Sequence, residues 1–326
     1  MHQLLTPRRL RRLIQSFFLL ASLWVGWRFF LFYQWATGAS DAFTPRPGGV
    51  EGFLPISALL GLKHLLATAR FDHVHPAGLT IFLAAIAMAL LVRKGFCGYV
   101  CPVGLISNLL ESLGRKLKLA KVPPKWLDRS LMAVKYGILL FFLWTVCWNM
   151  PAQAVEQFLN SPFNVVSDAK MLHFFLHPSM IALLVFGVLI ICSVVLRNFW
   201  CRLLCPYGAF LGLLALCGPT TIRRDAATCI DCKKCTRGCP GGIPVHEKRD
   251  VRSPECVGCA ECIGNCPVEG CLKVNVAGAG PIPWMSLALG AAGIFLLFYV
   301  LAHITGRWNA ELPPQMLKRF YGMLIH

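Results

Sequence analysis

The cysteines are the residues of this sequence whose spacing most directly indicates chemistry. The chain has 16 cysteines, and those between Cys229 and Cys266 follow the pattern C-x2-C-x2-C-x3-C-P twice. In this pattern three thiolates on one tight loop can reach three irons of a [4Fe-4S] cubane, whereas the fourth thiolate is directed to the other cluster. The spacing therefore predicts two clusters. The first uses Cys229, Cys232, Cys235 and Cys266, and the second uses Cys256, Cys259, Cys262 and Cys239.

Zinc is the main alternative for these thiols, because four-cysteine sites built from C-x2-C pairs are common in zinc ribbons. Zinc needs neither the third cysteine of each run nor the proline that follows the fourth, so the pattern favours iron and sulfide. Since each run lends its fourth cysteine to the other cluster, the two clusters are expected to lie close enough to exchange electrons. Cys271 is an extra thiol and is expected to be spare.

Two further pairs have the spacing Cys-x3-Cys-Pro, namely Cys97 with Cys101 and Cys201 with Cys205. Cysteines four residues apart share one side of a helix, so the two thiolates of each pair can bind the same metal centre. Four thiolates select an iron-sulfur cluster, zinc or Cu(I), and we expect a third metal centre here, most simply another cluster. The alternative is inert buried thiols, since cysteine often behaves as a small hydrophobic residue. Duplication of the whole pattern favours a metal or redox role.

Two histidines and two glutamates recur at matching places in the chain: His75 and His177, and Glu51 and Glu156. Oxidation of a quinol releases protons as well as electrons, so a quinone site needs acceptors of this kind near the head group. We take these four residues as candidate catalytic groups. Two opposed histidines could instead bind haem b through both axial positions, and a structural role at a helix start is a third interpretation.

Composition places these sites in a membrane protein. The chain is 326 residues long, 56% hydrophobic and only 14% charged, against about 25% charged in a typical soluble domain. The net charge of +17 does not indicate a nucleic-acid partner, because the basic residues gather beside long apolar stretches. Metal-ligand spacing also excludes a disulfide scaffold for most of the cysteines.

Five apolar stretches approach the roughly 20 residues that a membrane-spanning helix needs. They cover residues 13–36, 77–92, 130–150, 179–196 and 283–302. Arginines before the first stretch predict a cytoplasmic N-terminus, and alternation then places the cysteine-rich segment in the cytoplasm. The repeated histidines and glutamates and the tail from His303 would be periplasmic. The expected location is the cytoplasmic (inner) membrane, crossed several times.

The sequence predicts that the first membrane hairpin is repeated. Val50-Glu51-Gly52-Phe53-Leu54 matches Val155-Glu156-Gln157-Phe158-Leu159 (155 − 50 = 105), and His75-Pro76 matches His177-Pro178 (177 − 75 = 102). Residues 93–104 match residues 197–208 (197 − 93 = 104). The expected fold is an all-α transmembrane bundle with a tandem two-helix repeat and a small α+β two-cluster ferredoxin domain. The expected domains are membrane repeat 1 (1–125), membrane repeat 2 (126–219), the ferredoxin domain (220–278), and a last transmembrane helix with a tail (279–326).

These motifs together resemble the NapH/NosR/CcoG group of membrane-bound polyferredoxins. The resemblance covers the chain from the first apolar stretch through Cys271 and rests on the two Cys-x3-Cys-Pro motifs followed by a two-cluster ferredoxin. It implies electron transfer between the quinone pool or cytoplasmic reductants and a periplasmic or membrane redox partner, as a subunit of a quinol dehydrogenase. The oxidase-assembly member of the group is a copper reductase. The chain departs from the NosR type in lacking a large N-terminal flavin-binding domain, and its tail, residues 308–326, has no counterpart that we assign and is a candidate docking segment.

The leading hypothesis is therefore an iron-sulfur relay that serves a partner oxidoreductase. The outer quinone site and the inner clusters would lie about a bilayer apart, roughly 30 Å, so a haem or a partner subunit would bridge them. A metal reductase or assembly factor that handles copper at the Cys-x3-Cys-Pro pairs is the second hypothesis. A sensor without turnover is the third. The sequence does not fix the direction of electron flow.

Overall fold

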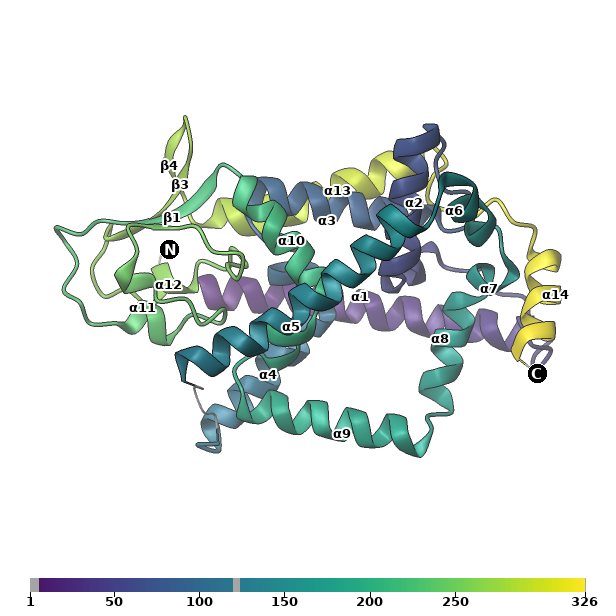
Figure 1. Ribbon diagram of the computed structural model, residues 1–326, viewed down its shortest axis with the longest axis horizontal. Helices are drawn as coiled ribbons and strands as arrows, with labels where there is room; N and C mark the ends of the chain where they lie inside the picture. The colour runs from purple at the N-terminus through teal and green to yellow at the C-terminus, as the bar shows by residue number, and fades with distance from the viewer. Residues whose placement is uncertain (1–5, 120–123, 326) are drawn as a thin grey trace. The chain divides into compact units, whose positions relative to one another are not determined.

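The computed structural model describes residues 6–119 and 124–325, which fall into two compact units. Unit 1 contains Met1–Leu19, Ala85–Leu139 and Gly187–Phe295. Unit 2 contains Leu20–Ala84, Leu140–Phe186 and Leu296–His326. The strands and most cysteines belong to unit 1. Figure 1 shows the helices and strands of the described residues.

Within residues 6–119 and 124–325, three helices are long and apolar enough to cross a membrane. They are α1 (Pro7–Ala36), the segment Trp126–Asn149, which joins α5 (Lys125–Leu143) to η3 (Trp144–Asn149), and α13 (Met285–Ile304). A bent pair, α8 (Ser167–Leu176) and α9 (Met180–Val195), with 83° between its helices, makes a fourth span if it is counted as one. The apolar α3 (Pro76–Val92) has 17 residues, or about 25 Å, slightly less than the bilayer core. Each predicted stretch is helical, which agrees with a multi-pass membrane protein. The number of spans stays a prediction.

A small antiparallel sheet in unit 1 has the strand order β2-β1-β3-β4. Its strands are β1 (Thr220–Arg224), β2 (Asp250–Val251), β3 (Leu272–Val276) and β4 (Gly280–Ile282). Ile222 pairs with Val251 on one side and with Val274 on the other, and all three side chains are buried. They share a core with cysteines that come from the short helices α11 (Lys234–Arg237) and α12 (Glu261–Gly264) and from the loops beside them. A small α+β ferredoxin fold therefore surrounds the cysteine runs.

The two Cys-x3-Cys-Pro motifs have the same local structure. In each, an apolar helix ends, a residue with positive φ follows (Arg93 or Asn198), and a π-helical turn then carries the first cysteine. The second cysteine is extended, as expected before proline, and the proline opens the next helix, where a missing N–H costs nothing. The elements are α3, η2 (Phe96–Val100) and α4 (Pro102–Lys116), and then α9, η4 (Trp200–Leu204) and α10 (Pro206–Cys217).

The tail of the chain is part of the core of unit 2. It forms α14 (Pro314–Ile325), whose Tyr321 and Leu317 are buried and pack in a cluster with Phe29, Phe32 and Val166. The sequence predicts this tail as a docking segment, and the structure buries its Leu317 and Tyr321 within unit 2, whereas Met316 and Met323 of α14 are exposed. The remaining helices are η1 (Gly48–Phe53), α2 (Pro55–Thr68), α6 (Ala152–Leu159), α7 (Pro162–Val165) and η5 (Val245–Glu247).

Candidate functional site

The cysteines assigned to the first cluster line one cavity of unit 1. This cavity has an empty volume of about 330 Å³, and its walls include Ile230, Val268 and Leu272. The thiols around it are those of Cys229, Cys232, Cys235, Cys266 and Cys271. The fourth cysteine of the second run thus lies with the first three of the first run. Cys271, expected to be spare, also reaches this cavity, and its Sγ lies 3.6 Å from the carbonyl oxygen of Asp225.

The cysteines assigned to the second cluster line another cavity of about 360 Å³. Four thiols face it, those of Cys239, Cys256, Cys259 and Cys262. Apolar side chains supply much of the remaining wall, including Ile222, Ile243, Val245 and Val251. The second cavity is therefore the more enclosed by core residues, whereas residues 225–228 and Ile230 beside the first cavity are exposed.

The two runs also share a strained turn. Lys233 and Ala260, which directly follow the second cysteine of each run, have φ values of 59° and 55° and cap α11 and α12. Non-glycine residues adopt this conformation at a cost of about 1 to 3 kcal/mol, and such residues concentrate at functional sites. The turn places the third cysteine, Cys235 or Cys262, on the short helix that follows.

The donor set of each cavity fits an iron-sulfur cluster. None of the cysteines is in a disulfide, and in residues 6–119 and 124–325 no three histidine, cysteine, aspartate or glutamate side chains converge closely enough to hold a single ion. The four thiols of each set instead surround a cavity, and soft thiolate ligands suit iron-sulfur clusters. Burial raises the pKa of Cys239 to about 11, whereas a hydrogen bond from the Asp231 backbone lowers the pKa of Cys229. Cluster binding would therefore displace protons from the buried thiols.

The Cys-x3-Cys-Pro pairs come together in unit 1. Cys97 interacts electrostatically with Cys101 and Cys205, and Cys101 interacts with both Cys201 and Cys205. Each pair spans a π-helical turn rather than the α-helical turn expected from the sequence, because the N–H of Cys101 bonds to the Phe96 carbonyl and the N–H of Cys205 to the Trp200 carbonyl. π turns are frequent at functional sites. The structure therefore provides a third group of four thiols.

Both Cys-x3-Cys-Pro hairpins contact the loops of the second cluster site. In the first hairpin, the backbone N–H of Lys94 lies 3.4 Å from the Cys256 carbonyl oxygen, and the Tyr99 hydroxyl donates to Gly258. In the second, the Arg197 guanidinium donates to the Cys239 carbonyl at 3.2 Å. Cys239 and Cys256 come from different runs, and both belong to the second set. The second cluster site is thus the one that adjoins the Cys-x3-Cys-Pro group.

Buried charges reinforce this contact. The Glu255 carboxylate lies 2.5 Å from Lys135 Nζ and 3.6 Å from Lys94 Nζ, and all three side chains are at most 10% exposed. Burial alone would raise the pKa of Glu255, but the two lysines hold it below its usual value. Arg93, only 1% exposed, donates to the carbonyl oxygens of Ala215 and Ser253. Removing one partner of such a group leaves an uncompensated buried charge, at a cost of about 3 to 5 kcal/mol.

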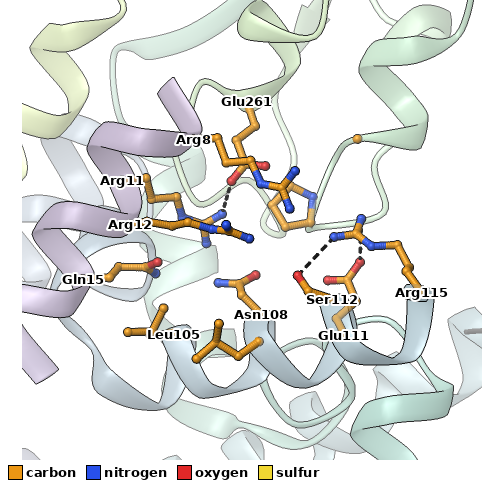
Figure 2. Close-up of a pocket in the computed structure, with 13 residues that line it drawn as sticks. Arg8, Arg11, Arg12, Gln15, Leu105, Asn108, Glu111, Ser112, Arg115 and Glu261 are labelled. Atoms are coloured by element: carbon orange, nitrogen blue, oxygen red, sulfur yellow. Dashed lines mark hydrogen bonds and ion pairs between the residues drawn. The ribbon is translucent and has the colours of Figure 1, made fainter. Parts of the chain in front are cut away.

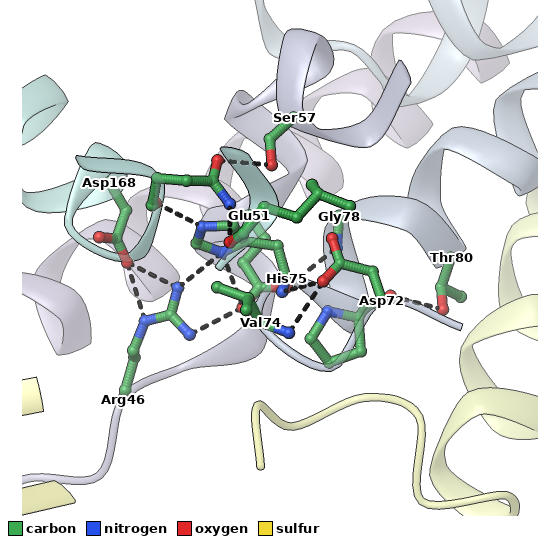
Figure 3. A network of polar contacts seen from close by, with 12 residues as sticks. Arg46, Glu51, Ser57, Asp72, Val74, His75, Gly78, Thr80 and Asp168 are labelled. Carbon is green, nitrogen blue, oxygen red and sulfur yellow. Dashed lines mark hydrogen bonds and ion pairs between the residues drawn. The ribbon is translucent and has the colours of Figure 1, made fainter. Parts of the chain in front are cut away.

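A second polar site occupies unit 2, where Arg46 joins two acids and a histidine (Figure 3). Its guanidinium lies 2.7 Å from both Glu51 and Asp168 and 3.2 Å from His75 Nδ1. His75 Nε2 lies 2.8 Å from the Asn164 carbonyl oxygen and so carries a proton. Nδ1 can then accept from Arg46 when the ring is neutral, or donate to Glu51, 3.5 Å away, when it is charged. Both protonation states of His75 therefore have a partner.

The charge of this network favours a proton on His75. One arginine between two carboxylates leaves a net charge of −1. Burial opposes the charged imidazole, but the hydrogen bond and charge of Glu51 outweigh it and raise the pKa of His75. The Tyr321 hydroxyl from α14 donates to Asp168 at 2.8 Å, which ties the tail to the network. The site can hold a proton in a buried position.

The candidate residues of the second repeat lie elsewhere. Glu156 on α6 and His177 at the end of α8 are exposed, and in the described part of the chain neither has a contact with Arg46, Glu51 or His75. The His177 ring instead packs on His173, with centroids 4.7 Å apart. The structure thus brings together Glu51 and His75 but not their counterparts. Arg46, Asn164, Asp168 and Tyr321 were missed, although ionisable residues in so apolar a chain are themselves a functional signal.

Comparison with known families agrees with this arrangement of cysteines. A model described as a 4Fe-4S binding domain matches twice, at residues 74–120 and 176–224. A second model, described as a 4Fe-4S dicluster domain, matches residues 221–267. The first matches cover the two Cys-x3-Cys-Pro hairpins, and the second covers the two cysteine runs. No solved structure matches the fold.

Related proteins are similar over most or much of the chain. YccM of Escherichia coli is 40% identical over 301 residues, which are 90% of this chain and 83% of YccM. The ferredoxin-type protein NapH of Haemophilus influenzae is 29% identical over 59% of this chain and 67% of its own length. The regulatory protein NosR of Pseudomonas aeruginosa is 31% identical over 55% of this chain but only 24% of NosR. The chain therefore belongs to the NapH/NosR-type family of membrane-bound 4Fe-4S polyferredoxins.

Proposed function

We propose that this protein relays electrons between the quinone pool and a partner oxidoreductase through two [4Fe-4S] clusters and a third metal centre in the cytoplasmic membrane. The observation that carries the proposal is the contact of both Cys-x3-Cys-Pro hairpins with the loops of Cys239 and Cys256. Bound iron-sulfur clusters supply one-electron transfer, and the chain fixes where they are held. The three centres then follow one another along the relay. The exposed group of thiols that includes Cys229 comes first, the buried group that includes Cys256 lies in the middle, and the Cys-x3-Cys-Pro group comes last.

The exposed end of this relay suits exchange with another protein. Ile230 is 65% exposed beside the first cavity, and Lys233 and Lys234 are exposed on the same loop. An exposed apolar side chain beside Lys234, Lys233 and the Asp231 that pairs with Lys233 favours a partner with an acidic surface around its own redox centre. Either a cytoplasmic donor or a cytoplasmic acceptor fits this surface, so the direction of flow is left to experiment.

We propose that quinol gives its protons to His75 in unit 2. The network of Arg46, Glu51 and Asp168 stabilises the protonated ring, and Glu51 lies close enough to receive the proton from Nδ1. His177 and Glu156 are exposed and lie outside this network.

Copper handling is the second candidate function. It is favoured by one observation, the electrostatic interaction among the thiols of Cys97, Cys101, Cys201 and Cys205. A set of soft ligands alone suits Cu(I) as well as an iron-sulfur cluster. In this case the clusters would reduce copper rather than exchange electrons with quinol.

The assignment of ligands across the two runs can be tested with cysteine variants. Cys239→Ser and Cys256→Ser are expected to remove the same cluster, so these two variants share one residual EPR signal. Cys232→Ser is expected to remove the other cluster. Each should lose about four of about eight ferredoxin irons. Iron, acid-labile sulfide and EPR of the dithionite-reduced protein measure this, with Cys217→Ser as a control. If Cys239→Ser matches Cys232→Ser instead, each run holds its own cluster and the crossed assignment is wrong.

The third centre is tested by metal content. We expect about twelve irons in the anaerobically purified protein and about eight in Cys97→Ser or Cys201→Ser, because each removes a ligand of the proposed third cluster. Reduction by quinol should be lost in these variants, while reduction by dithionite persists. A wild-type protein with about eight irons and bound Cu that the variants lack would make copper reduction the better assignment.

The relay order is tested at Gly98, where the first Cys-x3-Cys-Pro hairpin contacts the loop of the second cluster site. A Cβ atom here would lie 2.4 Å from the Val257 carbonyl oxygen, so Gly98→Ala must separate the hairpin from the second cluster loop. We expect a loss of about 1 to 3 kcal/mol of stability and a quinol-dependent cluster reduction slowed at least tenfold, with iron content retained. Gly137→Ala is the matched control, since a Cβ there meets nothing within 4 Å. Equal rates in both variants would exclude this contact from the path.

The proton acceptor is tested by pH. The base must be neutral to accept a proton, and the pKa of His75 is raised above its usual 6.5. The quinol-dependent rate should therefore rise with pH through a midpoint above 6.5. His75→Gln should lose this dependence and slow the reaction by about 10² to 10⁴, the usual contribution of a general base. Glu156, the exposed counterpart of Glu51 in the second repeat, serves as a control, and Glu156→Gln should behave as wild type. An unchanged pH profile in His75→Gln would rule the residue out.

A further inference from the structure

A third cavity in unit 1 is lined by arginines that the proposed relay does not use (Figure 2). It has an empty volume of about 410 Å³ and lies among the first turns of α1, one side of α4, and residues beside the cysteines of the second cluster site. Its charged lining residues are Arg8, Arg11, Arg12, Arg115, Glu111 and Glu261. Neither a thiol nor a histidine lines it, so the cavity is distinct from the metal sites.

Two of the four arginines are already paired. The Arg11 guanidinium, 4% exposed, lies 2.7 Å from Glu261 and also donates to the Gly98 carbonyl oxygen. Arg115 lies 3.3 Å from Glu111. Four arginines and two glutamates leave a net charge of +2. This excess falls on Arg8 and Arg12, whose guanidinium groups make no ion pair or hydrogen bond within residues 6–119 and 124–325, and both line the cavity (Figure 2).

The start of a long helix adds to this potential. α1 begins at Pro7, and because the Arg9 N–H bonds to the Thr6 hydroxyl, the dipole of the helix rather than a row of free N–H groups favours an anion here. Gln15 and Asn108 also line the cavity, and their amide nitrogens, which donate to the carbonyl oxygens of Gly98 and Gly104, keep one further N–H each. Guanidinium groups, amides and a helix start together match the oxygens of a phosphate group, which arginine binds through paired hydrogen bonds.

Apolar side chains adjoin the same cavity. Leu105 and Leu109 line it, and Ile106, Leu109 and Leu113 on α4 are 48%, 50% and 46% exposed. Their spacing of three and four residues makes one exposed apolar stripe on α4, which is typical of a helix that lies in a membrane interface. On α1, Leu13 and Phe17 are 64% and 66% exposed. A free phosphate would use none of this surface, whereas a lipid would cover it with its acyl chains.

We propose that this cavity binds the phosphodiester head group of an anionic phospholipid, with the acyl chains along the apolar stripe of α4. Basic pockets at the ends of membrane helices are suited to such head groups. Because Gly238 and Pro240 flank Cys239, and Glu261 lies between Cys259 and Cys262, the bound phosphate joins α1 and α4 to the loops of the second cluster site. The proposal requires the membrane location of the chain but not its activity with quinol.

Binding can be measured on the full-length, cluster-loaded protein in a neutral detergent. The probes are short-chain phosphatidylglycerol, phosphatidylcholine of the same chain length, glycerol phosphate and inorganic phosphate. We expect phosphatidylglycerol to bind at least tenfold more tightly than phosphatidylcholine, since only the former has a net negative charge. Arg8→Gln/Arg12→Gln should weaken this binding by about tenfold or more, the effect of losing one charged hydrogen bond.

Arg9→Gln is the matched control, because it removes the same charge from the same exposed turn of α1 but does not line the cavity. Unchanged iron content shows that each variant is folded. Equal binding by the double variant and the control would overturn the proposal. Inorganic phosphate or glycerol phosphate that binds as tightly as phosphatidylglycerol would keep the phosphate chemistry but replace the lipid by a soluble phosphate ligand. Loss of quinol activity alone in any variant would bear on the relay and not on this site.

Discussion

The contact between the loop of Cys256 and the first Cys-x3-Cys-Pro hairpin is the constraint on which the rest of unit 1 depends. Gly98 has no side chain, so the Val257 carbonyl can approach the π turn, and Lys94, Tyr99 and Arg93 then hold the loop by its carbonyl oxygens. Such bonds use backbone atoms, so the loop side chains remain free to line the second cavity. The Glu255 ion pairs secure the same contact with charges that are costly to bury singly.

Much of the ferredoxin site was predictable because its determinants are local. Three cysteines of each set come from one loop of eight or fewer residues, so spacing alone groups them, and the structure places Cys266 and Cys239 at the cavities that the crossed pattern predicts. The apolar helices were predictable for a similar reason, since continuous hydropathy is a property of one segment. The π turns were not predictable, because a spacing of four residues is compatible with either an α-helical or a π-helical turn.

The network around Arg46 could not be predicted, because its members are distant in the sequence. Arg46 and Asp168 are 122 residues apart, and Tyr321 and Asp168 are 153 apart. The internal repeat even misdirected the prediction, since it gave Glu156 and His177 the same weight as Glu51 and His75. Similar sequence placed these residues in different surroundings: a loop and α14 cover the first pair, whereas the second pair stays exposed. Only three-dimensional packing distinguishes the two copies.

The burial of Tyr321 has a practical consequence for handling this protein. Its hydroxyl holds Asp168, so the last described helix positions a carboxylate of the Arg46 network. An affinity tag, a fluorescent protein or a topology reporter fused after residue 326 would extend directly from this packed helix. Such a fusion would act as a perturbation of the network rather than as a neutral label.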